Sequence, residues 1–311
     1  MSQTFEVVSV NVSVEKGTVK LPQPAVEIDG RGLVGDAHAG PWHRQVSLLD
    51  EASRLRFHDE TGREAAPGAF GENLTLRGLP AAEVAPLDRL SVGEVELEVT
   101  QIGKACHGTG CEIFHQVGRC VMPSEGLFAR VRRGGRVAAG DRGVYHPRAL
   151  KVLVVTLSDR AAAGVYPDRS GPRVCELLEK GLAGSRWHLT VESRILPDCA
   201  EDLHRTLTEA LAGDVDAVFT TGGTGVGARD VTPEVVAGLC ERLVPGIVEQ
   251  IRTKHGAANP RARLSRAVAG VAGTTQLYAL PGSVRAVEEY VPEILATFDH
   301  LLLMLHGVDA H

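Results

Sequence analysis

The residues best suited to chemistry lie in the second half of the chain, where glycines and aspartates follow short apolar runs. The segment TTGGTGVGARDVTPE (220–234) comes directly after the apolar run DAVF and places four glycines within eight residues. Glycine lets backbone N–H groups approach phosphate oxygens closely, and Thr232 as N-cap followed by Pro233 at N1 predicts a helix start that also favours anions. The pattern therefore predicts a phosphate-binding loop, with Asp230 at its edge and with a cradle formed by Gly222, Gly223 and Gly225.

Two common nucleotide-binding motifs do not describe this loop. No Gly-Lys-Ser/Thr sequence follows the glycines, and the spacing in GGTGVG differs from that of the dinucleotide fingerprint. A purely structural alternative is a tight connection from strand to helix in which Asp230 caps a turn.

Further carboxylates follow neighbouring apolar segments. Asp198 follows HLTVESRIL, and Ser158 and Asp159 follow KVLVVTL. Because the carboxyl ends of parallel strands meet at one edge of a sheet, we expect these side chains to lie beside the glycine loop. Mg²⁺ usually binds through one or two carboxylates together with substrate phosphates, so carboxylates gathered at this edge are suited to a magnesium site. Asp198 could equally cap the helix predicted over AEDLHRTL.

The elements that position these residues show a regular alternation. Strands are predicted over KVLVVTLS, HLTVESRIL, DAVFTTGG and TTQLYALPG, and helices over PRVCELLEKGLAG, AEDLHRTLTEALAG and PEVVAGLCERL. A long final helix is expected from about Ser283, interrupted at Pro292. This alternation favours a three-layer α/β domain with a mostly parallel sheet covered by helices on both faces.

The first half of the chain has a different period. FEVVSVNVS, RQVSLLD, ENLTLRGL and LSVGEVELEVTQIG are typical of strands, and in the last one Val95, Leu97 and Val99 alternate with polar residues. No long helical pattern appears before residue 112. We expect a mainly β domain, a barrel or a sandwich, with little helix.

Length and composition complete this organisation. With 311 residues, two domains are expected, residues 1–147 and 151–311, joined by a connector over 146–150. The net charge is −6, and 17 basic against 19 acidic residues in 1–148 give no basic excess typical of nucleic-acid binding. The sequence shows no leader and no long apolar run, so a cytoplasmic protein without membrane association is expected.

The C-terminal motifs resemble a known family. SDRAAAGVYPDRSGP (158–172), TTGGTGVGARDVTPE, LSRAVAG (264–270) and LPGS (280–283) are similar to the molybdopterin adenylyltransferases, the MogA/MoaB-like domains of molybdenum cofactor biosynthesis. The resemblance implies that the terminal phosphate of molybdopterin attacks the α-phosphate of ATP with Mg²⁺ assistance, releasing pyrophosphate. It also implies a homo-oligomer, a trimer or a hexamer.

The resemblance assigns roles residue by residue. Asp198 and Asp230 become the catalytic, Mg²⁺-associated carboxylates. The loop residues that would bind phosphate or pterin are Gly222, Gly223, Thr224 and Gly225. The rest of the pocket would be lined by Ser158, Asp159, Asp168, Ser265, Gly282 and Ser283. Ser265 and Ser283 could instead be a strand-end residue and a helix N-cap.

Cysteines gather in the first half, in QIGKACHGTGCEIFHQVGRC (101–120). Cys106, Cys111, His115 and Cys120 could ligate zinc, although the segment has no CxxC pair, and buried free thiols are the structural alternative. Cys106 differs because Lys104 and His107 flank it, and nearby positive charge favours a nucleophilic thiolate.

The surrounding motifs resemble the MOSC domain, which is related to the C-terminal part of molybdenum cofactor sulfurases. They are GLVGDAHAGPWHRQVSLLD (32–50), FGENLT (70–75) and EGLFARVRRGGRVAAGD (125–141). The resemblance implies a β-barrel that binds molybdenum cofactor and a sulfur-carrying cysteine, here Cys106. Arg44, Asn73 and Arg130 become candidates for holding the cofactor's phosphate.

Both resemblances lead to one expected function. The C-terminal domain would adenylylate molybdopterin, and the N-terminal domain would bind the cofactor or transfer sulfur, with molybdenum-insertion proteins or molybdoenzymes as partners. The alternative is a non-catalytic carrier of molybdopterin or molybdenum cofactor, which would bind its ligand without consuming ATP.

Overall fold

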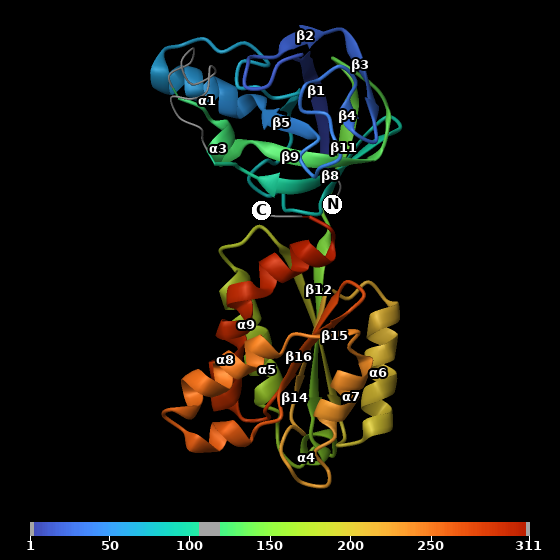
Figure 1. Cartoon of the computed structure of the whole chain (residues 1–311), viewed down its shortest axis with the longest axis vertical. Coiled ribbons are helices and arrows are strands. Elements are labelled where there is room, and N and C mark those ends of the chain that lie inside the picture. The colour runs from blue at the N-terminus through green and yellow to red at the C-terminus, as the bar shows by residue number, and fades with distance from the viewer. Residues whose placement is uncertain (1–2, 106–118, 309–311) are drawn as a thin grey trace. The chain divides into compact units, whose positions relative to one another are not determined.

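The chain divides into two compact units, Met1–Arg148 and Ala149–His311. The computed structural model describes residues 3–105 and 119–308 (Figure 1). The division falls inside the predicted 146–150 connector, and Ala149 and Leu150 already belong to the first strand of the second unit. Each unit has its own hydrophobic clusters.

The N-terminal unit is built on a closed barrel of seven strands. These are β1 (Gln3–Val12), β5 (Val46–Asp50), β6 (Leu74–Arg77), β7 (Arg89–Val92), β8 (Val95–Ile102), β9 (Leu127–Arg133) and β11 (Arg142–His146). Pairing runs in the order β1-β11-β7-β8-β9-β5-β6 and returns to β1; only β5 and β6 pair in parallel. The short strand β2 (Leu21–Gln23) pairs with β1, and a separate sheet contains β10 (Gly135–Ala138), β3 (Ala25–Asp29) and β4 (Gly32–Leu33).

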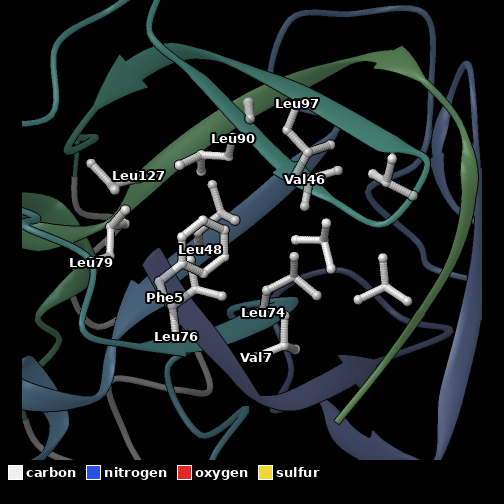
Figure 2. Close-up of a cluster of buried hydrophobic side chains, with 14 of the residues drawn as sticks. Phe5, Val7, Val46, Leu48, Leu74, Leu76, Leu79, Leu90, Leu97 and Leu127 are labelled. Atoms are coloured by element: carbon white, nitrogen blue, oxygen red, sulfur yellow. The ribbon is translucent and has the colours of Figure 1, made fainter. Parts of the chain in front are cut away.

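The barrel interior is filled by aliphatic side chains together with two aromatic ones, Phe5 and Tyr145 (Figure 2 labels Phe5). Val95, Leu97 and Val99 of β8 point into this core, as the alternating pattern predicts. The predicted strand over LSVGEVELEVTQIG is in fact a hairpin, because the chain turns at Gly93 between β7 and β8.

One helix of the N-terminal unit was not apparent from the apolar pattern: α1 (Glu51–Thr61). Its ends carry local signals, since the Asp50 side chain accepts from the Ala52 N–H and Gly62 closes the helix at φ +66°. Phe57 is the main apolar contact, packing edge-to-face on Phe70 with ring centroids 5.0 Å apart. The other described helix of this unit is the single turn α3 (Met122–Glu125).

The C-terminal unit contains a six-stranded sheet in the order β13-β12-β14-β17-β16-β15. The strands are β12 (Ala149–Leu157), β13 (His188–Leu196), β14 (Ala217–Thr221), β15 (Arg242–Leu243), β16 (Val268–Ala272) and β17 (Thr275–Leu280). The first four in the sheet order are parallel, and β16 is antiparallel to both neighbours. The predicted parallel sheet is confirmed, with an antiparallel addition that the sequence pattern did not indicate.

Helices cover both faces of this sheet (Figure 1). They are α4 (Asp159–Ala162), α5 (Ser170–Leu182), α6 (Ala200–Ala212), α7 (Thr232–Leu239), α8 (Pro245–Gly256), the 3₁₀ helix η2 (Pro260–Leu264) and α9 (Val284–Leu305). One core joins the sheet to α5, α8 and α9, and the other joins it to α6 and α7. The three-layer α/β architecture is thus confirmed.

The final helix differs from the prediction. α9 is a single helix of 22 residues that continues through Pro292 without interruption. Proline removes one intrahelical hydrogen bond, but a buried stripe holds the helix on the sheet: Val287, Tyr290, Val291, Ile294, Phe298 and Leu302. No helix within the described ranges has the length and apolar character needed to cross a membrane.

Candidate functional site

A cavity of about 660 Å³ opens at the carboxyl ends of β12, β13 and β14. Seven of the predicted site residues line it: Ser158, Asp159, Asp168, Asp198, Gly223, Asp230 and Gly282. Three more belong to the glycine loop without lining the cavity: Gly222, Thr224 and Gly225. The topology therefore brings together residues that lie more than 100 positions apart in the sequence, at the edge where α/β sheets bind ligands.

Asp159 and Asp198 hold each other in place across two neighbouring strand ends. The Asp198 N–H donates to Asp159 Oδ1 at 2.9 Å, and the Asp159 N–H donates to Asp198 Oδ2 at 3.3 Å. Arg229 of the glycine loop contacts Asp159 and lies 3.5 Å from Asp198 Oδ2. Two carboxylates and one guanidinium thus share this part of the cavity.

The glycine loop needs its glycines for backbone reasons. Gly222 has φ +104°, and a Cβ there would lie 2.3 Å from the Leu157 carbonyl oxygen. Gly223 has φ +60°, and a Cβ there would meet the Thr232 hydroxyl at 2.5 Å. Neither position accommodates a side chain without displacement of its neighbours.

The helix after the loop begins differently from the prediction. Val231 is the N-cap of α7, and Thr232 is its first residue. The Thr232 hydroxyl donates to the Gly222 carbonyl at 2.8 Å, so it ties the helix back to the loop instead of capping the helix. The expected N-cap role of Thr232 is therefore wrong.

Backbone donors in the loop are available to an anion. The N–H groups of Gly223, Thr224 and Gly225 make no hydrogen bond to any residue of the described ranges. Successive unpaired N–H groups attract phosphate oxygens. This feature fits the predicted phosphate cradle.

Arg266 supports the loop from the short segment between η2 and β16. Its N–H donates to the Thr224 carbonyl at 3.0 Å, and its guanidinium donates to the carbonyls of Gly225 and Asp230, both at 2.6 Å. It also pairs with Glu234. Sequence reasoning missed Arg266 as well as Arg229, although each is adjacent to a predicted site residue.

Asp230 combines the structural and the functional interpretations. Its Oδ2 accepts from the Gly227 N–H at 2.8 Å, which is the turn-capping role, and its side chain lines the cavity. A Cβ at Gly225 would lie 2.7 Å from the same oxygen, so the glycine makes room for the carboxylate.

Asp168 and Ser158 also line the cavity and anchor the segments around it. Asp168 Oδ2 accepts from the Thr156 hydroxyl at 2.6 Å, while its Oδ1 accepts from the N–H groups of Ser170 and Gly171 at the start of α5. The Ser158 hydroxyl caps α4 and lies 3.0 Å from the Tyr166 hydroxyl. Both residues are thus engaged in holding neighbouring segments.

Ser265 and Ser283 line a different, smaller cavity of about 200 Å³. Ser283 also caps α9 by accepting from the Ala286 N–H at 3.2 Å, which is the alternative that the sequence left open. Burial raises the pKa of Tyr290, which lines the same cavity. Gly282 remains at the larger cavity, next to Gly222.

The oxygen donors of the larger cavity fit a Mg²⁺ ion that reaches the site with phosphates. Asp159, Asp198 and Asp230 supply only hard carboxylate oxygens. Within the described residues, no group of three or more His, Cys, Asp or Glu side chains lies close enough to hold a metal alone. Such a donor set suits a cation that completes its shell with substrate oxygens and water.

The barrel unit has a second cavity, of about 310 Å³, with cationic and aromatic walls. Arg44, Lys16 and Lys104 line it, together with Trp42 and Phe128. The Arg44 guanidinium lies 4.8 Å above the Trp42 ring, and its buried Nε has no partner among the described residues. An unpaired buried donor beside two lysines is suited to an anionic ligand.

The two other predicted phosphate contacts of this unit do not line the cavity. Asn73 is buried, accepts from the Ser47 N–H and hydroxyl, and donates to the Asn11 carbonyl. Arg130 donates to Glu98 through Nε at 2.9 Å and Nη2 at 2.6 Å. These hydrogen bonds give both residues structural roles. Cys106, Cys111 and His115 lie outside the described residues, so the sulfur-carrier and zinc hypotheses are not tested.

A buried ion pair supports the wall of the barrel cavity. Lys20 Nζ donates to both oxygens of Asp36 at 2.6 Å, and Asp36 accepts from the backbone of His38, which lines the cavity. Burial opposes ionisation of Asp36, but hydrogen bonds from His38 and the charge of Lys20 outweigh it and hold the pKa well below its usual range. Burial also lowers the pKa of Lys20.

Comparison with known families assigns both units. Residues 153–300 match the family described as probable molybdopterin binding domain, and residues 35–143 match the MOSC domain. Molybdopterin adenylyltransferase from Haemophilus influenzae is 38% identical over 141 residues, which are 45% of this chain and 70% of that protein.

Two further relatives each match about half of the chain. Gephyrin from Dictyostelium discoideum is 32% identical over 162 residues, covering 50% of this chain but only 22% of gephyrin. The crystal structure of a molybdopterin biosynthesis protein from Mycobacterium abscessus is 34% identical, with a TM-score of 0.46, and covers 51% of this chain and 97% of that one. The chain therefore belongs, through its C-terminal unit, to the molybdopterin adenylyltransferase family, and a MOSC domain precedes that unit.

Proposed function

We propose that the C-terminal unit transfers the adenylyl group of ATP to molybdopterin, as one step of molybdenum cofactor biosynthesis. The observation that supports this most directly is that Gly223, whose N–H is one of the unpaired loop donors, lines one cavity together with Asp159, Asp198 and Asp230. The cavity thus offers donors for phosphate oxygens and acceptors for a divalent cation. The family relationship supplies the substrate class.

The proposed reaction is a substitution at phosphorus. A phosphate oxygen of molybdopterin forms a bond to the α-phosphorus of ATP, the bond from that phosphorus to the α,β-bridging oxygen breaks, and pyrophosphate leaves. Mg²⁺, when bound, neutralises charge on the phosphates. The protein positions the two substrates, and the N–H groups of Gly223, Thr224 and Gly225 stabilise phosphate charge. Asp198 and Asp230 would hold the cation, with Asp159 as a third carboxylate tied to Asp198 by backbone hydrogen bonds.

The test is pyrophosphate release by the purified full chain with molybdopterin, ATP and Mg²⁺. We expect Asp198→Asn and Asp230→Asn each to lower turnover at least about 100-fold, because each removes a charge that positions the cation. Asp214→Asn is the matched control, since Asp214 is exposed and lies outside the cavity. Wild-type turnover in both cavity variants would contradict the proposal.

The carrier alternative gives a different result in the same assay. A molybdopterin carrier binds its ligand in equilibrium dialysis but releases no pyrophosphate beyond its own concentration. Turnover by the wild type at substrate concentrations far above the protein concentration excludes that alternative.

For the barrel unit, we propose binding of molybdenum cofactor through its phosphate. The cationic cavity with the unpaired Nε of Arg44 supports this proposal. Sulfur transfer by Cys106 remains part of it, tested by Cys106→Ala. We expect Arg44→Gln to weaken cofactor binding about tenfold, as for loss of a charge-assisted hydrogen bond. Arg136→Gln, in an exposed position of β10, is the control. Equal affinity of Arg44→Gln and wild type would contradict the assignment.

A further inference from the structure

Arg229 connects three loops of the cavity through one guanidinium. It extends from the loop after β14 to Asp159, which follows β12, and to Asp198, which follows β13. Its side chain is 71% exposed. Among the described residues, Asp159 and Asp198 are its only hydrogen-bond or ion-pair partners.

Arg266 shows what a structural arginine does in the same loop. Its guanidinium donates to two loop carbonyls, and its side chain is only 35% exposed. Among the described residues, the Arg229 guanidinium donates no hydrogen bond to the loop backbone, in contrast to Arg266. The contrast leaves Arg229 free to change partners.

The partners of Arg229 are also the oxygens that a divalent cation would use. Asp159 and Asp198 line the cavity. The Arg229 guanidinium supplies these two carboxylates with the positive charge that a bound divalent cation would otherwise supply. Exposed ion pairs of this kind are weak, so a divalent cation can displace the arginine. A guanidinium released from carboxylates binds phosphate well, because its planar donors match phosphate oxygens.

We propose that Arg229 is an exchangeable counter-ion, which neutralises Asp159 and Asp198 in the ligand-free protein and moves to a nucleotide phosphate when a divalent cation takes these carboxylates. The inference rests on the proposed adenylyl-transfer function for the identity of the nucleotide. Its consequence is that Arg229 opposes cation binding alone and favours binding of cation and nucleotide together.

Two binding measurements on the full chain test this inference. In the first, Mn²⁺ is titrated without nucleotide and free Mn²⁺ is followed by electron paramagnetic resonance. We expect Arg229→Gln to bind Mn²⁺ about two- to fivefold more tightly than wild type, as for removal of an exposed competing ion pair. In the second, ATP is titrated calorimetrically at saturating Mn²⁺. We expect the same variant to bind ATP about tenfold more weakly.

The controls separate this role from a structural one. Arg229→Lys keeps the positive charge and should restore most of the ATP affinity. In the wild type, the Arg173 guanidinium pairs with Glu176 and Glu288 outside the cavity. The Arg173→Gln variant should therefore match wild type in both titrations. Unchanged or weaker Mn²⁺ binding by Arg229→Gln, or unchanged ATP binding, would overturn the inference.

The result is distinguishable from failure of the proposed function. If wild type releases no pyrophosphate while the two affinities of Arg229→Gln shift in opposite directions, the exchange is supported and adenylyl transfer is not. If pyrophosphate is released and Mn²⁺ binding does not tighten in Arg229→Gln, the function is supported and the exchange is refuted.

Discussion

At the scale of single residues, the site depends on positions where only glycine fits. Gly222 shows this most clearly, because it combines φ +104° with a carbonyl oxygen 2.3 Å from the place a Cβ would take. Its own carbonyl accepts from Thr232, so a shift at Gly222 also moves the start of α7. Backbone geometry and helix placement are coupled at this one residue.

We therefore expect Gly222→Ala to lower the free energy of unfolding of the C-terminal unit by about 1–3 kcal/mol and to abolish pyrophosphate release. Thermal unfolding and the turnover assay measure the two effects. Gly238→Ala is the matched control, because Gly238 lies within α7 with open space around its Cα and alanine favours helix there. A Gly222→Ala protein as stable and active as wild type would show that the loop tolerates a side chain.

Site residues could be predicted from the sequence where a reactive side chain follows the end of a predicted strand. Asp159, Asp198 and Asp230 meet at one cavity because each follows a parallel strand, and that relation is legible in the sequence. Arg130 could not be placed in the same way. Its partner Glu98 lies directly opposite it on β8, and this pairing depends on the register of β8 against β9.

At the scale of elements, periodic segments were predicted well and aperiodic ones were not. The strand β13 has the predicted bounds, His188–Leu196, because an uninterrupted β-rich run lies between clear turn residues. The helix α1 escaped prediction because Ser53 and Phe57 are its only buried residues, too few to form an apolar stripe. Its caps at Asp50 and Gly62 are the only local signals.

The helix α9 shows that tertiary packing can override a residue that locally disfavours helix. Pro292 predicts an interruption from local rules, yet the helix continues because burial of its apolar stripe outweighs one missing hydrogen bond. Tertiary packing therefore decides the length of this element, and packing partners such as α5 and β17 are not known before the fold is.

At the scale of the whole molecule, the hydrophobic clusters follow the division into two units. Two clusters contain only residues before Arg148, and two contain only residues after Ala149. Each unit has a core large enough for a domain of its size, so each should fold when made alone. We therefore propose residues 1–148 and 149–311, close to the expected domains 1–147 and 151–311, as independent folding units.

The whole-molecule prediction is that separate chains of residues 1–148 and 149–311 each unfold cooperatively, and that the second retains pyrophosphate release. Phe219→Ala in residues 149–311 should cost about 3–5 kcal/mol, because Phe219 is fully buried and stacks on Tyr278 with ring centroids 4.9 Å apart. Met304→Ala, at an exposed position of α9, should cost far less. Chemical denaturation measures both, and light scattering on the same samples tests the expected trimer or hexamer.

Failure of residues 149–311 to fold alone would contradict the prediction, because a core confined to this unit should be sufficient for its folding.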